Sequence, residues 1–255
     1  MTFNFKRVIQ LSLMTAFFFI GFSCNKDVVV INQVQTRGGL ALTFDDYSVD
    51  NWYSYLPMLD SFGVRATFYI SNYNKLTTAQ KNKLHDFESH GNEIAFHSTT
   101  HVDFLKYAES NSCDKLLKEE VANGMQLMIN DGFHPTTFAY PYGKHNEILD
   151  KLLLKSFKNV RALNGTASFA RSLSPLQGNK ILYGLGIDES SNRDLSKIKG
   201  LLSLAKQRNQ CAVLVVHNIE RTDINLQVPL WKLREILSKA RSLDLKFYTV
   251  SEISD

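Results

Sequence analysis

The chain has 255 residues, of which 44% are hydrophobic and 21% charged, a balance typical of a globular protein with room for one large α/β domain. The formal net charge of +4 is small, and no basic stripe with interleaved aromatic residues occurs. The sequence therefore gives no case for nucleic-acid binding, and it predicts no protein partner.

The N-terminus has the pattern of an export signal. A basic pair, Lys6-Arg7, precedes an apolar run over residues 8–22, which is short for a membrane span and typical of a signal peptide. The small residue before Cys24 resembles a bacterial lipobox, although Gly21 stands where Leu is usual. We expect the signal to be removed and Cys24 to be lipidated. The alternative is plain secretion with an unpaired Cys24.

These features predict three segments. Residues 1–23 form a lipoprotein-type signal peptide, residues 24–37 a tether, and residues 38–255 the folded domain. Lipidation would leave only Cys113 and Cys211 as thiols. We predict no disulfide between them, although an exported protein would permit one.

The stretch from Gly38 to Asp46 starts the folded chain. It reads as a buried strand that stops at two adjacent carboxylates, Asp45 and Asp46. Two acids this close repel each other unless a cation or a shared proton compensates. One interpretation is a strand end followed by an Asx turn. The later strand ends favour the other, in which the pair forms half of a metal-assisted hydrolytic site.

Strands and helices alternate along the rest of the chain. Further strands are expected near residues 66–70, 93–96, 136–140, 159–162, 181–183, 186–187, 211–216 and 246–250. Helices are expected near residues 50–62, 77–89, 114–129, 146–155, 194–208 and 229–240. This alternation predicts a parallel sheet. Closure into a βα barrel is favoured because the polar residues of interest all follow strands, where such barrels carry their chemistry.

Three more strand ends carry candidate chemistry. His97 and His101 follow the strand at 93–96, four residues apart, so a turn would bring them together. With Asp46 they offer one oxygen and two nitrogens, the composition of a catalytic zinc site with an open position. The strand at 136–140 ends in a Pro-x-Gly turn that can aim a backbone N–H at a ligand, and His217 follows the strand at 211–216. A histidine there is placed for general acid work, since its pKa lies near neutrality. A single histidine of this kind can also be a polar surface residue.

Taken together, these motifs resemble the polysaccharide deacetylase family, also called carbohydrate esterase family four or the NodB homology domain. The motifs are Thr43-Phe44-Asp45-Asp46, His97-Ser98-Thr99-Thr100-His101, Pro141-Tyr142-Gly143 and Val215-Val216-His217. The resemblance covers residues 39–250. It implies a distorted (β/α)7–8 barrel with its active site at the C-terminal ends of the strands.

The resemblance also implies a divalent metal, most often Zn²⁺, with Co²⁺, Ni²⁺ or Mn²⁺ as alternatives, held by Asp46, His97 and His101. It implies that Asp45 is the general base, that His217 is the acid, and that a metal-bound water attacks the acetyl carbonyl. Three further residues receive roles by the same resemblance. The Tyr142 N–H helps hold the oxyanion, Pro141 contributes to the substrate site, and Val215 lines the pocket for the acetyl methyl.

The sequence departs from the family in two places. Ala139 stands where the family often has an Arg that steadies the catalytic Asp, and Arg161 at the end of the next strand is the nearest replacement. The family's Asp-and-Trp motif is not visible between residues 163 and 193. Trp52 and Tyr53 could supply sugar stacking, with a helix-core role as the alternative.

The sequence as a whole predicts a metal-dependent deacetylase of N-acetylated amino-sugar glycans. We expect an exported lipoprotein of a bacterial cell envelope, attached through its lipid anchor and placed at the outer membrane. One alternative is an O-acetyl esterase acting on acetylated plant polysaccharide. The other is a catalytically inactive, glycan-binding lipoprotein.

Overall fold

The computed structural model describes residues 37–165 and 168–253. Residue contacts divide the chain into two units, 1–35 and 36–255, and every described residue belongs to the second. The predicted signal peptide, the lipidation site Cys24 and all of the tether except Arg37 lie outside the described residues. Within the described part, no helix is both long and apolar enough to cross a membrane.

Seven parallel strands of the described chain close into a ring. In ring order they are β1 (Gly39–Asp46), β2 (Thr67–Ile70), β3 (Glu93–Phe96), β4 (Thr137–Ala139), β5 (Asn159–Leu163), β7 (Ile181–Gly186) and β8 (Cys211–Val216). The pairing of β8 with β1 closes the barrel. The ring is distorted between β3 and β4, which are in register only at Phe96 and Phe138. The predicted (β/α)7–8 barrel is therefore confirmed.

Two short strands lie outside the ring. The strand β6 (Leu173–Ser174) runs antiparallel to β8, and β9 (Lys246–Phe247) pairs with the start of β1. One or two short strands are expected over residues 181–187, and the structure has the single strand β7 there.

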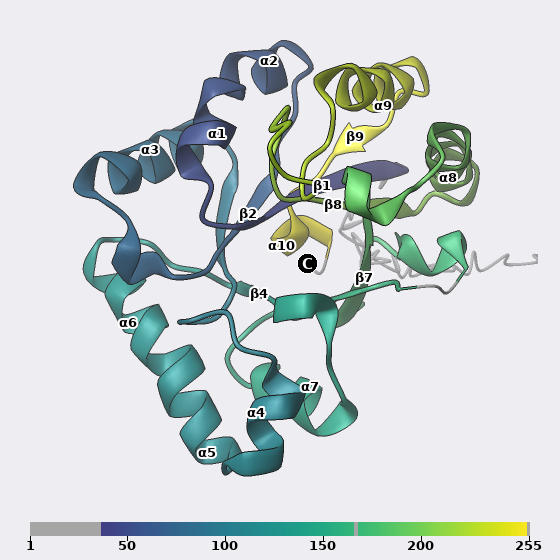
Figure 1. The fold of residues 1–255 in the computed structure, drawn as a ribbon. Coiled ribbons are helices and arrows are strands. Elements are labelled where there is room, and N and C mark those ends of the chain that lie inside the picture. Colours follow the sequence, from purple (N-terminus) through teal and green to yellow (C-terminus); the bar gives the residue numbers. More distant parts are fainter. Residues whose placement is uncertain (1–36, 166–167, 254–255) are drawn as a thin grey trace, which may run out of the picture. The chain divides into compact units, whose positions relative to one another are not determined.

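Helices cover the outside of the ring (Figure 1). They are α1 (Val49–Ser54), α2 (Leu56–Ser61), α3 (Thr78–Ser89), α4 (Phe104–Ser110), α5 (Cys113–Leu116), the π-helical η2 (Leu117–Ala122), α6 (Asn123–Asn130), α7 (Glu147–Leu153), α8 (Leu195–Arg208) and α9 (Leu230–Ser242). The 3₁₀ turns are η1 (Tyr73–Lys75), η3 (Pro141–Gly143), η4 (Phe169–Ser172) and η5 (Glu189–Ser191). The last helix, α10 (Val250–Ile253), is seen within the outline of the ring (Figure 1).

The strands sort their side chains with a period of two, because neighbouring residues of a strand point to opposite faces. Along β1, Leu40, Leu42 and Phe44 belong to the larger core cluster under the helices. Ala41 belongs to a separate inner cluster that also contains Tyr69 of β2. Asp45 continues the inward-facing register of Ala41, so its side chain lies where the barrel interior opens at the C-terminal end of β1.

The predicted helix over residues 50–62 is two helices instead. Pro57 lies in the first turn of α2, and Tyr55 between the helices has φ −104° and ψ 0°. Proline has no N–H to donate to the carbonyl four residues earlier, so one continuous helix cannot pass through it.

The predicted last strand over residues 246–250 is also wrong beyond Phe247. The chain turns into α10 because polar groups inside the barrel bind its first amides. The Ser251 N–H donates to Glu93 at 3.0 Å, and the Val250 N–H donates to the Thr67 hydroxyl at 2.9 Å. The helix α10 therefore plugs the N-terminal end of the ring, and the opposite end remains for chemistry.

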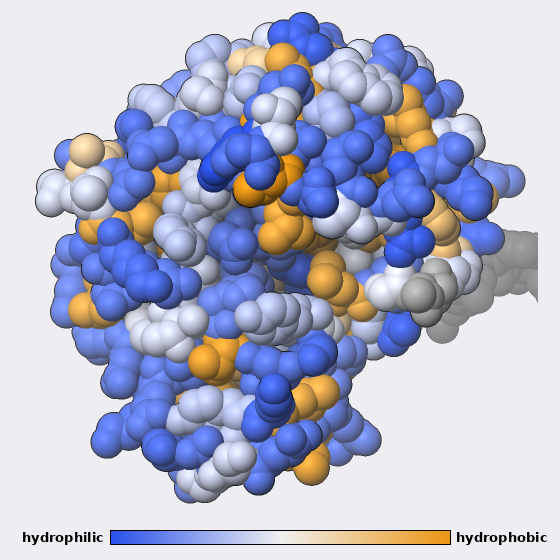
Figure 2. Space-filling view, in the orientation of Figure 1, coloured by the Kyte–Doolittle hydropathy of each residue, from blue (hydrophilic) through white to orange (hydrophobic). Residues whose placement is uncertain are grey.

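On the face of the molecule shown in Figure 2, hydrophilic residues dominate and apolar residues form small scattered groups. The two described cysteines, Cys113 and Cys211, are free thiols, and Cys211 is wholly buried.

Candidate active site and metal centre

The predicted site residues meet at the C-terminal ends of the parallel strands. Asp45 and Asp46 end β1, His97 directly follows β3, and His217 directly follows β8. Parallel strands all point the same way around the ring, so residues far apart in sequence gather at one rim.

The two adjacent carboxylates converge instead of diverging. Asp45 is buried at 3% exposure and points inward, while Asp46 has the unusual φ of 85°. This left-handed conformation turns the chain between them. As a result, His97 Nε2 lies 3.9 Å from Asp45 Oδ2 and also 3.9 Å from Asp46 Oδ1.

A tight turn brings the two histidines together. Ser98 and His101 have φ of 69° and 62°, and the His101 N–H donates to Ser98 Oγ at 2.9 Å. The imidazole rings of His97 and His101 lie 4.8 Å apart between centroids. His101 Nε2 lies 3.2 Å from Asp46 Oδ1.

Glu120 holds this turn from outside the ring. Its carboxylate is buried at 4% exposure and accepts the Thr100 N–H at 2.9 Å and the Thr100 hydroxyl at 2.6 Å. Its carbonyl accepts the Thr99 N–H at 3.0 Å. Glu120 lies in the π-helical η2, a rare form that is frequent at functional sites. The histidine turn is thus anchored by a neighbouring helix.

Asp46, His97 and His101 fit a divalent cation. One ligand atom from each lies within 4.8 Å of the others. His97 Nδ1 donates to the Ala139 carbonyl at 2.8 Å, which fixes the tautomer and leaves the Nε2 lone pair facing the other two ligands. Burial lowers the pKa of His97 to about 4, so the ring stays neutral, as a ligand must be.

Arg161 on β5 contacts Asp45 from the opposite side of the barrel. It is wholly buried, and its Nη2 donates to both Asp45 oxygens at 2.5 and 2.6 Å. Burial alone would raise the pKa of Asp45, but the charge of Arg161 and the nearby histidines hold it below its usual value.

The register explains how Arg161 can reach this point. Ala139 and Arg161 are paired across β4 and β5, so they lie at the same level of the barrel. Gly184 makes the room, because a Cβ there would lie 3.1 Å from Arg161 Cδ and 2.3 Å from Val215 Cγ2.

His217 is held by an acid that the sequence analysis missed. Its Nδ1 lies 2.6 Å from Asp188 Oδ2, and its backbone N–H donates to Asp188 Oδ1 at 3.2 Å. Burial would lower the pKa of His217, but the hydrogen bond to Asp188 and the charges of Asp45, Asp188 and Asp46 raise it to about 9. Asp188 follows the strand β7, so an acid at a strand end was the available signal.

The remaining predicted residues lie around these groups. Tyr142 is 58% exposed with φ 59°, and its ring centroid lies 4.8 Å from that of His101. Pro141 is buried at the start of η3. Val215 is wholly buried and is paired with Thr43, two residues below Asp45.

The prediction that Trp52 stacks on sugar is wrong, and its helix-core alternative holds. Trp52 is wholly buried, with its ring centroid 5.4 Å from that of Phe68. Its Nε1 donates to the His217 carbonyl at 2.6 Å, so it supports the backbone of the candidate acid and offers no face to a ligand.

Comparison with known proteins gives the following matches. The family model for polysaccharide deacetylase matches residues 32–157. A probable peptidoglycan-N-acetylglucosamine deacetylase of Arthroderma benhamiae is 22% identical over 226 residues, 88% of this chain. The match covers 45% of that relative, so the chain spans about half the length of the curated protein it matches.

Two solved structures share the fold. The chitin deacetylase of Colletotrichum lindemuthianum superposes with a TM-score of 0.62 at 18% identity, over 86% of this chain and 88% of that one. A peptidoglycan deacetylase of Bacillus subtilis superposes with a TM-score of 0.56 at 20% identity, over 85% and 90%.

Proposed function

We propose that this chain, which belongs to the polysaccharide deacetylase family, is a metal-dependent hydrolase that removes N-acetyl groups from amino-sugar glycans. The observation that carries the proposal is the convergence of a metal-type triad, a buried carboxylate and a histidine bonded to a buried acid at one rim of the barrel. Relatives named for peptidoglycan N-acetylglucosamine and for chitin support an amino-sugar substrate.

Asp46, His97 and His101 would hold the divalent ion, with Zn²⁺ as the favoured metal from this nitrogen and oxygen donor set. When bound, such an ion lowers the pKa of a coordinated water and polarises a carbonyl oxygen. Asp46 and the histidine turn fix the ion at the open end of the barrel, where a glycan chain has access.

Asp45 acts as the general base. Arg161 keeps its carboxyl ionised and therefore ready to take a proton, and the two hydrogen bonds fix its direction. Arg161 thus takes over the steadying role that the family assigns to the position of Ala139. Arg161 on β5 can do this from the strand next to β4, because Ala139 and Arg161 are paired in register and lie at the same level of the barrel.

His217 acts as the general acid. With a pKa raised to about 9, it carries a proton at neutral pH and can give it to the departing amine. An amide nitrogen is a poor leaving group without a proton, so this group favours amide over ester hydrolysis. Asp188 orients the ring through Nδ1 and leaves Nε2 free to face the substrate.

The Tyr142 N–H would support the developing oxyanion, and Val215, with Pro141 beside it, would line the pocket for the acetyl methyl. Val215 lies two residues before His217 on an inward-facing position, which places it beneath the reacting groups.

A substrate screen tests the function. The purified chain should release acetate from chitin oligomers or peptidoglycan, and Asp45→Asn should release it on the order of 10²–10⁴-fold more slowly. Acetate from acetylxylan but from no amino-sugar glycan would favour the O-acetyl esterase instead. Glycan binding without any acetate release would favour the inactive lipoprotein.

The same proposal extends to location. We propose that Cys24 carries a lipid that anchors the protein in a bacterial envelope, at the outer membrane. Cys24→Ser should move the protein from the membrane to the soluble fraction. Unchanged membrane association, with no lipid mass on the N-terminus, would exclude the lipoprotein.

A further inference from the structure

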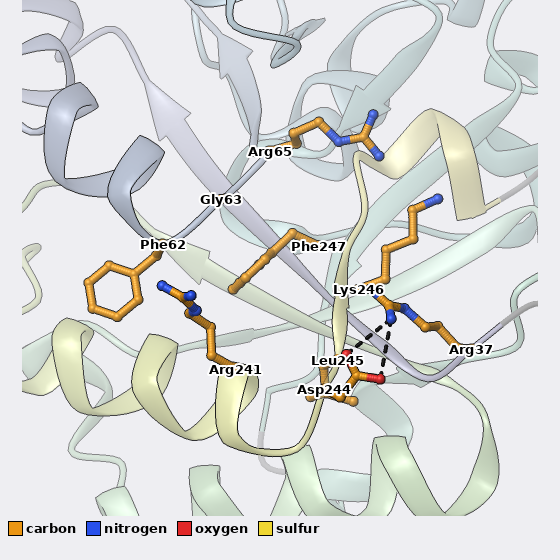
Figure 3. A pocket seen from close by; sticks show the side chains of 9 residues that line it. All are labelled: Arg37, Phe62, Gly63, Arg65, Arg241, Asp244, Leu245, Lys246 and Phe247. Carbon is orange, nitrogen blue, oxygen red and sulfur yellow. Dashed lines mark hydrogen bonds and ion pairs between the residues drawn. The ribbon is translucent and has the colours of Figure 1, made fainter.

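A basic pocket of about 420 Å³ lies at the end of the barrel opposite the catalytic residues (Figure 3). Arg65 stands just before β2, and Lys246 is paired with Gly39, the first residue of β1. Arg241 lies in the last turn of α9. Arg65 and Lys246 thus mark the N-terminal ends of strands, whereas the metal ligands lie at the C-terminal ends.

The pocket carries more cations than carboxylates. Arg37 donates to both oxygens of Asp244, at 3.0 and 3.2 Å, and Arg65 donates to both oxygens of Glu252, at 2.7 and 3.0 Å. Lys246, 3.6 Å from Glu252, shares a carboxylate that Arg65 already uses.

Arg241 has only a neutral partner. Its Nη1 donates to the Ser61 carbonyl at 3.1 Å, and within the described chain no carboxylate lies at ion-pair distance from it. Among the described residues, the pocket lining holds four cationic side chains and one carboxylate, Asp244. Counting Glu252 as well, which lies outside the lining and pairs with Arg65 and Lys246, two positive charges remain in excess. Phosphate oxygens are strong acceptors for clustered Arg and Lys donors.

The pocket is also partly apolar and larger than one phosphate requires. Phe62, Leu245 and Phe247 share its lining with the basic side chains (Figure 3). This combination suits a phosphate that is attached to a larger group, with donors for the anion and rings for the carbon atoms next to it.

The covalent connection of the chain gives the site its context. Arg37 lines the pocket and is the first described residue, so the tether predicted for residues 24–37 joins the fold at this point. A lipid on Cys24 would then be at most 13 residues from the pocket, a span that extended chain covers in roughly 45 Å.

We propose that this pocket binds the phosphate of an anionic phospholipid headgroup and so keeps the catalytic end of the barrel turned away from the membrane, toward the glycan. The inference goes beyond deacetylation, because no catalytic residue takes part in it. The inference rests on the proposed lipid anchor only in that the anchor would hold the protein close to a membrane.

Vesicle flotation of the mature chain, residues 24–255, carrying Cys24→Ser tests the pocket without the lipid and without the apolar run of residues 8–22. We expect stronger binding to phosphatidylglycerol vesicles than to phosphatidylcholine vesicles. Adding Arg241→Gln and Lys246→Gln should weaken the phosphatidylglycerol binding about 5-fold for each charge removed. Arg241→Lys keeps the charge and should retain most of the binding.

Lys118→Gln with Lys155→Gln is the matched control, because both side chains are exposed and the pair removes the same net charge elsewhere. Equal losses in the two double variants would overturn the pocket and leave only overall charge. No preference for phosphatidylglycerol would overturn it as well. If inorganic phosphate binds the pocket as tightly as the vesicles do, the ligand is the free anion and the headgroup assignment is wrong. Acetate release measured on the same variants reports on folding independently.

Discussion

Asp188→Asn tests the acid directly. Burial lowers the pKa of His217, and the bond and charge of Asp188 with the charges of Asp45 and Asp46 raise it to about 9 from the ordinary 6.5. That net rise corresponds to roughly 3 kcal/mol of preference for the protonated ring. A cation on Asp46 offsets part of the effect of that carboxylate, whereas the bond of 2.6 Å to Asp188 is unaffected. Asparagine keeps an acceptor oxygen but has no charge, so the pKa of His217 should fall by about 1–2 units.

The assay is the pH dependence of kcat/KM on an N-acetylglucosamine oligomer, which reports the groups of the free enzyme. A general acid is lost as pH rises through its pKa, so the high-pH limb should move to lower pH by the same 1–2 units. Above the limb, each unit lowers the rate about tenfold.

Asp150→Asn is the matched control for this experiment. Asp150 is also buried and also contacts a histidine, His145, at 3.0 Å, but it lies outside the site. Its variant should keep the wild-type limb. An unmoved limb in Asp188→Asn, with the control intact, would refute the assignment of His217 as the acid tuned by Asp188.

Three further predictions concern the metal ligands, the general base and the carboxylate that holds the histidine turn. His97→Ala should lose most of the bound divalent ion, measured as metal content per chain, and full activity in metal-free protein would rule out the metal proposal. Asp45→Asn should keep its metal and lose on the order of 10²–10⁴-fold in kcat. Asp46→Asn should lose metal affinity first, and its activity should return at high added metal. The reverse pattern in metal titration and kinetics would exchange the roles of the two acids. Glu120→Gln should weaken metal affinity about 10–100-fold, because the histidine turn loses its charged acceptor. Glu119→Gln is the control and should keep the wild-type affinity. Equal metal affinities of the two variants by calorimetry would show that the turn does not need this carboxylate.

The site was readable from sequence where its parts are local. Asp45-Asp46, the His97 to His101 turn and His217 each directly follow a buried strand, and parallel strands end at one rim. Identifying the strands was therefore enough to predict which residues would meet.

The supporting residues were not readable in the same way. Asp188 stands in a stretch without a clear motif, and Glu120 reaches the histidine turn from a π-helical segment 20 residues later. The role of Trp52 stayed open between sugar stacking and the helix core, because an aromatic residue on an amphipathic helix has the same pattern whether it faces a core or a ligand. Only the packed structure shows that its ring is wholly buried.

By itself, the sequence determined the alternation of strands and helices, the barrel class and the residues at the strand ends, because these depend on short-range periodicity and on the common direction of parallel strands. The tertiary structure decided the rest. The pairing of Ala139 with Arg161 lets an arginine on the neighbouring strand reach Asp45, and the left-handed conformation of Asp46 lets two adjacent acids face the same histidine. Which residues pair across neighbouring strands, and which side chains then meet inside the ring, depends on contacts between residues far apart in the chain, so short-range periodicity alone does not specify them.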